Sequence, residues 1–96
     1  MTQINLTEEM RKAIKRCVWF EPPEQAIKDA PRLAAYILTH GMPEDTDALR
    51  AQITDDELRE LLDQAPAGIY DARSWAYWNL VIGRYETPPL PVRSFE

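Results

Sequence analysis

The chain has 96 residues, which is enough for one small domain with a single hydrophobic core. Hydrophobic residues make up 45% of it, which excludes wholesale disorder, and the net charge of -5 argues against a protein that binds duplex nucleic acid. The single cysteine excludes an internal disulfide, and no apolar run is long enough for a membrane span. The first residues lack the pattern of a signal peptide, so we expect a soluble, cytoplasmic protein.

The first predicted helix covers residues 7–18. Thr7 can cap its N-terminus, and Glu8 and Glu9 lie at the positive end of the helix dipole, where carboxylates are favoured. Apolar residues recur at helical spacing on one face, opposite a basic face. The basic face consists of Arg11, Lys12, Lys15 and Arg16. This pattern predicts an amphipathic helix with one side in the core.

Two aromatic residues, Trp19 and Phe20, follow this helix directly. Pro22 and Pro23 come next and end any helix, because proline has no backbone N–H to donate. The residue before a proline is biased towards extended geometry, so the chain turns away at this point. We therefore expect the helix to stop at Val18 and both aromatic side chains to turn inward.

A single turn and a longer helix are predicted next. The turn covers residues 24–28, and the helix covers residues 29–40. Asp29 can cap this helix, and Pro31 is tolerated in its first turn. Gly41 ends it, because glycine can adopt the positive φ found at many helix ends.

Two further helices are predicted in the acidic part of the chain. The first is short, covers residues 43–51 and begins with a cluster of carboxylates. The second has the clearest start signal in the chain, since Thr54 and Glu57 fit a capping box. Leucines at helical spacing form its core face, and Pro66 with Gly68 ends it.

The last predicted helix is rich in aromatic residues, and it begins at Asp71 as a cap and stops at Gly83. Its pattern is apolar nearly all round, so we expect burial on most sides and a central place in the fold. Trp75 and Trp78 could stack a base or a sugar, but this pattern favours core packing for both.

Proline-dense residues 87–92 predict an extended segment close to polyproline II. This segment either docks into an aromatic groove as a proline-rich ligand or folds back over the domain's own surface, and the sequence leaves both open. The predicted fold is all-α, a compact bundle of four to five short helices with an extended proline-rich C-terminal tail. The helical domain covers residues 1–86 and the tail residues 87–96.

No catalytic constellation stands out. His40, Asp71 and Ser74 can be drawn as a triad, but their spacing does not support one, and His40 is interpreted as a histidine at a helix C-terminus. Cys17, on the apolar face of the first helix, is interpreted as a small buried hydrophobe. A carboxylate stripe, interpreted as a solvated face and not as a cation site, consists of Asp56, Glu60 and Asp63. We therefore expect no catalytic residue, no cofactor and no metal.

Several segments resemble a group of small, uncharacterised bacterial proteins. They are Trp19-Phe20-x-Pro22-Pro23-Glu24-x-Ala26, residues 33–41, residues 65–80, and Pro88-Pro89-Leu90-Pro91. The run Gly-Ile-Tyr-Asp-x-Arg-Ser-Trp-Ala-Tyr-Trp-Asn at residues 68–79 is specific enough to identify a family. The group is associated with genes beside nucleotidyltransferase-type toxins of abortive-infection systems. The resemblance implies an antitoxin-like protein with such a toxin as its partner, and it carries over no catalytic residue.

The leading hypothesis is a non-enzymatic interaction module that binds another protein or a second copy of itself. Its candidate contacts are the basic face, the carboxylate stripe and four tail residues. The candidates are Arg11, Lys12, Lys15, Arg16, Asp56, Glu60, Asp63, Leu90, Val92, Arg93 and Phe95. The alternative is a small nucleic-acid-binding regulator of helix-turn-helix type, which the acidic balance disfavours. A small metal-dependent enzyme is the third and weakest hypothesis.

Overall fold

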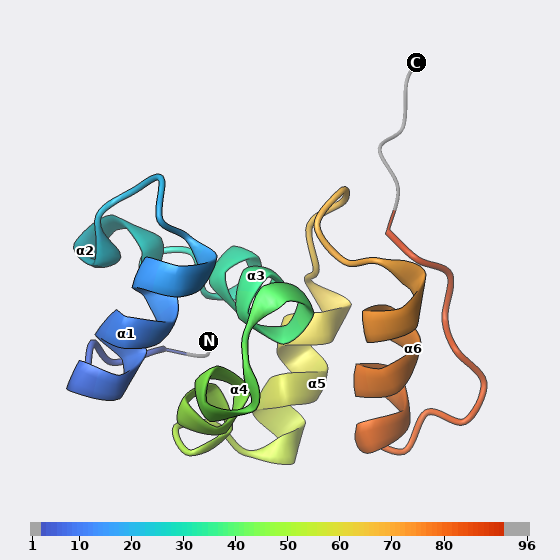
Figure 1. The fold of residues 1–96 in the computed structure, drawn as a ribbon. Helices are drawn as coiled ribbons and strands as arrows, with labels where there is room; N and C mark the ends of the chain where they lie inside the picture. The colour runs from blue at the N-terminus through green and yellow to red at the C-terminus, as the bar shows by residue number, and fades with distance from the viewer. Residues whose placement is uncertain (1–2, 92–96) are drawn as a thin grey trace.

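The computed structural model describes residues 3–91, and these contain six helices and no strand (Figure 1). The helices are α1 (Glu8–Cys17), α2 (Pro23–Ala26), α3 (Ala30–His40), α4 (Pro43–Arg50), α5 (Asp55–Asp63) and α6 (Ala72–Val81). The predicted all-α fold is confirmed, with the single turn α2 counted as a helix of its own. No helix among these residues is long and apolar enough to cross a membrane.

Four helices begin where capping residues predicted a start. Side-chain oxygens of Thr7, Asp29, Thr54 and Asp71 each accept a hydrogen bond from the backbone N–H three residues further on, at 2.7–3.2 Å. Glu57 accepts the reciprocal bond from the Thr54 N–H at 3.0 Å, which completes the predicted capping box. Local side-chain chemistry therefore accounts for the starts of α1, α3, α5 and α6.

Helix α3 lies at the centre of the bundle and contacts α1, α4, α5 and α6 (Figure 1). Its residues Leu33, Ala34, Ala35 and Ile37 are buried, which requires neighbours on several sides of one helix. The expectation that the C-terminal aromatic helix would be central is wrong. Helix α6 lies at the edge and packs against α3.

Helix α6 is buried along one face only. Trp75 and Trp78 are in the core, as predicted. Three other apolar side chains are exposed, namely Tyr77 at 57%, Leu80 at 53% and Val81 at 38%. The all-round apolar pattern thus does not reflect all-round burial, and part of the apolar surface of α6 faces solvent.

The polar residue Asn79 is fully buried on the inner face of α6. Its Nδ2 donates to the Trp75 carbonyl at 2.8 Å, and its Oδ1 accepts from Arg84 Nη1 at 3.1 Å. Gly83 has φ 87°, and the Arg84 N–H then reaches back to the Asn79 carbonyl at 2.9 Å. This closure is the glycine helix end that the sequence predicted for this position.

The described part of the tail, residues 87–91, has no helix and lies beside α6 (Figure 1). Trp75 Nε1 donates to the Pro88 carbonyl at 2.8 Å, and Leu90 packs against the core. Of the two options for this segment, contact with the domain's own surface is therefore present over residues 88–90.

The corner after α1 differs from its prediction. Val18 ends the helix and is buried, but Trp19 and Phe20 are 77% and 48% exposed. Phe20 packs edge-on against Tyr36 on the outer side of α3, with 5.5 Å between ring centroids, and the Arg32 guanidinium lies over both rings. The inward turn of both aromatic residues is therefore wrong, because Val18 already occupies the core at this corner.

Gly41 ends α3 as predicted but for a different reason. Its φ is -72°, which any residue can adopt. A Cβ at this position would lie 2.5 Å from the Ile37 carbonyl oxygen, well inside van der Waals contact. Glycine is therefore needed here for space, where α3 turns tightly into α4.

Candidate interaction site

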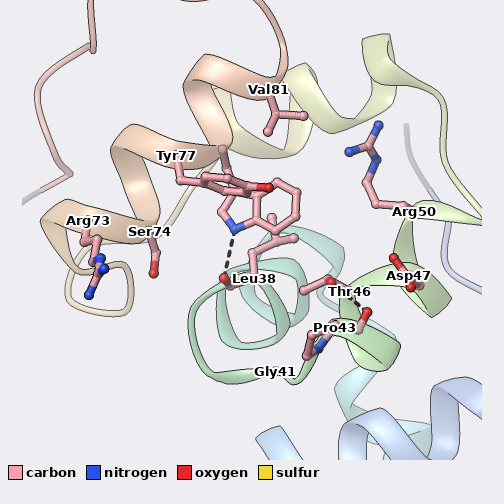
Figure 2. A pocket seen from close by; sticks show the side chains of 11 residues that line it. Leu38, Gly41, Pro43, Thr46, Asp47, Arg50, Arg73, Ser74, Tyr77 and Val81 are labelled. Atoms are coloured by element: carbon pink, nitrogen blue, oxygen red, sulfur yellow. Dashed lines mark hydrogen bonds between the residues drawn. The ribbon is translucent and has the colours of Figure 1, made fainter.

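A groove of about 750 Å³ lies between α6 and α4, over the C-terminal end of α3 (Figure 2). One wall is formed by α6 and the other by α4, and the floor includes Leu38 and Trp78. The residues that line it are Leu38, Gly41, Pro43, Thr46, Asp47, Arg50, Arg73, Ser74, Tyr77, Trp78 and Val81. None of the predicted contact residues that fall within residues 3–91 is among them.

Trp78, in the floor of the groove, makes two specific contacts. Its Nε1 donates to the Leu38 carbonyl at 2.9 Å, a bond between α6 and the last turn of α3. The Tyr77 ring stands edge-on against the indole, with ring centroids 5.0 Å apart. Edge-to-face aromatic pairs of this kind are favourable beyond the area that they bury.

The α6 wall combines apolar and basic side chains. Tyr77 and Val81 are one helical turn apart and both line the groove. Arg73, one turn before Tyr77, is exposed in the first turn of α6 and makes no ion pair with any residue in the range 3–91. Leu80 is exposed on the same helix but does not line the groove.

The α4 wall is polar. Thr46 Oγ1 donates to the Pro43 carbonyl at 2.9 Å, within α4 itself. Arg50 Nη2 lies 2.7 Å from Asp55 Oδ1 at the start of α5, so its charge is already compensated. Asp47 is exposed and, within the described residues, has no ion-pair partner.

The basic face predicted on α1 is partly engaged within the molecule. Arg11 pairs with Glu24 at 3.0 Å. Arg16 contacts Glu44 at 3.1 Å and Asp45 at 2.6 Å, both on α4. Lys12 and Lys15 are exposed. The two arginines thus join α1 to α2 and α4, which leaves less positive charge for an external partner than the sequence indicated.

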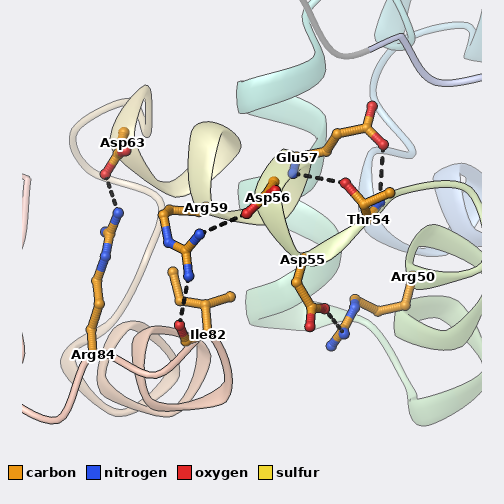
Figure 3. Close-up of polar contacts among 9 residues, drawn as sticks. All are labelled: Arg50, Thr54, Asp55, Asp56, Glu57, Arg59, Asp63, Ile82 and Arg84. Atoms are coloured by element: carbon orange, nitrogen blue, oxygen red, sulfur yellow. Dashed lines mark hydrogen bonds and ion pairs between the residues drawn. The ribbon is translucent and has the colours of Figure 1, made fainter.

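The carboxylate stripe on α5 is also partly engaged (Figure 3). Asp56 pairs with Arg59 at 2.8 Å, and Asp63 pairs with Arg84 at 2.6 Å. Arg59 Nη2 donates in addition to the Ile82 carbonyl at the end of α6, at 3.0 Å. Glu60 is half-buried. The Arg59–Ile82 and Asp63–Arg84 contacts join α5 to the C-terminal end of α6, whereas the Asp56–Arg59 pair lies within α5.

Of the four predicted contact residues in the tail, the structure describes one. Leu90 is half-buried against the core. Val92, Arg93 and Phe95 lie outside the described residues. The predicted contact residues that the structure describes thus lie on separate elements and do not form one site.

The residues considered for a catalytic triad lie at helix ends, at the start of α6 and at the end of α3. The Ser74 backbone N–H donates to Asp71 at 2.7 Å, which makes Asp71 the cap of α6 and lowers the pKa of its carboxyl. His40 is the exposed last residue of α3. Within residues 3–91 no group of three or more His, Cys, Asp and Glu side chains is placed to hold a metal ion.

Cys17 is buried, and this burial raises the pKa of its thiol from 9.0 to about 11. The thiolate is the reactive form, so its fraction near neutral pH falls about 100-fold for a rise of this size. We expect the native protein to react with a thiol reagent at pH 8 at least about 100-fold more slowly than the protein in urea. Absorbance at the wavelength of the released product gives both rates, and equal rates would contradict a buried thiol.

Comparison with known proteins finds no matching family model, no matching curated protein and no matching solved structure.

Proposed function

We propose that this protein is a non-enzymatic, cytoplasmic interaction module that receives a helix of another protein in the groove between α4 and α6. The observation that carries the proposal is the exposure of Tyr77 and Val81 directly beside a groove with an ordered aromatic floor. Clustered apolar side chains next to a hollow mark binding surfaces more often than scattered ones do.

The form of the groove supports a helix as the bound element. Both walls are helices, and residues line the groove at helical spacing on each, from Arg73 to Val81 on α6 and from Pro43 to Arg50 on α4. At about 1.5 Å per residue, each wall presents about two helical turns. An amphipathic helix in this groove would bury its apolar stripe against Tyr77, Trp78 and Val81 of α6 and place its polar edge along α4. The docking of an amphipathic helix into a groove is a common mode of peptide recognition.

The resemblance to proteins encoded beside nucleotidyltransferase-type toxins supports a toxin of that class as the partner. An antitoxin-like protein needs an accessible surface for its toxin and no catalytic residues of its own. Co-purification with the product of an adjacent gene tests this more specific proposal directly.

Variants of α6 test the groove itself. Tyr77→Lys places a charge in the groove, whereas Leu80→Lys places the same charge on the same helix, at a residue of similar exposure outside the groove. We expect Tyr77→Lys to weaken partner binding more than about 10-fold and Leu80→Lys to leave it nearly unchanged. Affinity purification from the producing cells, followed by titration of the recovered partner, measures both effects.

Circular dichroism is the control for folding in these variants. Val81→Lys, which changes a second groove residue, should weaken binding as Tyr77→Lys does. Equal binding by Tyr77→Lys and wild type, with both proteins folded, would reject the groove as the binding surface. A wild-type protein that captures no partner would count against the interaction module as a whole.

A further inference from the structure

We propose that the helix bound in this groove carries an acidic residue at one end of its apolar stripe and a basic residue at the other, where they face Arg73 and Asp47. The inference rests on the proposed function, because it specifies the partner of the same groove. It follows from the two charged residues of the groove that make no ion pair within the described part of the chain.

Two exposed residues of opposite charge line the groove. Arg73 on α6 and Asp47 on α4 are both exposed, and neither makes an ion pair within the described part of the chain. Figure 2 shows them at opposite sides of the groove, Arg73 beside Ser74 and Asp47 near Arg50. The two residues form no ion pair with each other, and a helix bound in the groove would pass between them.

The third charged residue in the lining of the groove, Arg50, is paired with Asp55. Asp71, two residues before Arg73, caps α6 by accepting the Ser74 backbone N–H, and it does not line the groove. Glu44, which follows Pro43 on α4, is paired with Arg16. In the lining of the groove a partner thus meets one positive and one negative residue without an ion pair, with apolar side chains between them.

Arg73 lies in the first turn of α6, where the positive end of the helix dipole disfavours a positive charge. An acidic side chain of a bound helix would be favoured there by both the guanidinium and the α6 N-terminus. A basic side chain at the other end would be favoured by Asp47 in the same way.

Selected peptides can supply the probe. Displayed 18-residue helical peptides with a varied apolar stripe are selected on wild-type protein and counter-selected on the Val81→Lys variant, so that binding depends on the groove. One selected peptide is then synthesised in two forms, with Glu and Lys at the two ends of its stripe and with these two residues exchanged. Fluorescence anisotropy measures the affinity of both forms.

The test is a charge exchange in the protein. Wild-type protein should prefer one form by at least about 5-fold, and the Arg73→Glu, Asp47→Lys double variant should prefer the other. Comparing two proteins removes the intrinsic preference of helices for acidic N-termini, which is the same in both titrations. The Lys28→Glu, Glu86→Lys double variant, which exchanges two exposed charges outside the groove, should keep the wild-type preference.

The outcomes separate this inference from the proposed function. An unchanged preference in the Arg73→Glu, Asp47→Lys protein would overturn the charge inference, while groove-dependent binding would still support the interaction module. If the selection yields no peptide that distinguishes wild type from Val81→Lys, the proposed function fails and the inference fails with it.

Discussion

Replacing Trp78 with alanine should lower the free energy of unfolding by about 3–5 kcal/mol. Trp78 is buried between α6 and α3, and its Nε1 makes the bond to the Leu38 carbonyl. Truncation to alanine removes this hydrogen bond and leaves a cavity beneath the groove, so α6 loses packing contacts with α3. For a domain of this size, each kcal/mol corresponds to about 4–8 °C in Tm.

Urea denaturation followed by circular dichroism measures this loss without relying on tryptophan fluorescence. Trp19→Ala is the matched control, because it makes the same chemical change at a residue that is 77% exposed, and it should change stability by about 0.5 kcal/mol or less. Trp78→Phe should fall between the two, since it keeps most of the packing but leaves the Leu38 carbonyl without its donor. Equal losses for Trp78→Ala and Trp19→Ala would contradict the packing of α6 on α3.

The helix boundaries could be predicted because their signals are local. A capping side chain bonds to a backbone N–H three residues away, so Thr54 and Asp71 reveal a helix start without knowledge of the rest of the fold. Proline acts equally locally, since it lacks a donor wherever the chain goes. These rules depend on neighbours in the sequence, and they hold in this protein.

The arrangement of the helices could not be predicted in the same way. The hydrophobic pattern of a helix shows how apolar each of its faces is, but it does not show which other helix covers that face. Leu80 and Asn79 show the difference, because the leucine is exposed whereas the asparagine is buried with its amide bonded to Trp75 and Arg84. A polar residue with satisfied hydrogen bonds is compatible with a core, and nothing in its spacing indicates this.

The groove could not be predicted from the sequence for a related reason. Its lining comes from three helices and from residues as distant in sequence as Leu38 and Val81. One signal was present, namely that α6 has more apolar surface than a helix at the edge of a small bundle can bury. This surplus predicts a central helix, but α3 occupies the centre and the surplus apolar surface of α6 faces the groove and solvent.

The order of charged residues along the chain shows which helix faces are acidic or basic, but it does not show which charged side chains form ion pairs with one another. Arg16 and Asp45 are 29 residues apart, yet the guanidinium donates to Asp45 Oδ1 through Nε at 3.1 Å and Nη2 at 2.6 Å. A basic face read from α1 alone therefore includes a residue whose main contact is an aspartate on α4. Contacts of this kind become visible only when the helices are placed in space.

Asp45 is the second residue at which a large effect is expected, and Asp45→Ala should lower the free energy of unfolding by about 2–4 kcal/mol. The side chain is 1% exposed, and it accepts hydrogen bonds from the Arg16 guanidinium and from the Met42 backbone N–H at 3.0 Å. Its loss leaves the Met42 donor unpaired at the start of α4 and breaks the link between α1 and α4. Chemical denaturation gives the magnitude.

Asp47→Ala is the matched control on the same helix, and it should change stability by about 0.5 kcal/mol or less, since Asp47 is exposed. The pairing itself is isolated by a double-mutant cycle with Arg16→Met and Asp45→Asn. Arg16→Met leaves a buried carboxylate without its counter-charge, so Asp45→Asn should cost less in that background than in wild type. Additive costs would mean that Asp45 stabilises α4 through Met42 alone and that α1 is held by apolar contacts, with no contribution from the ion pair.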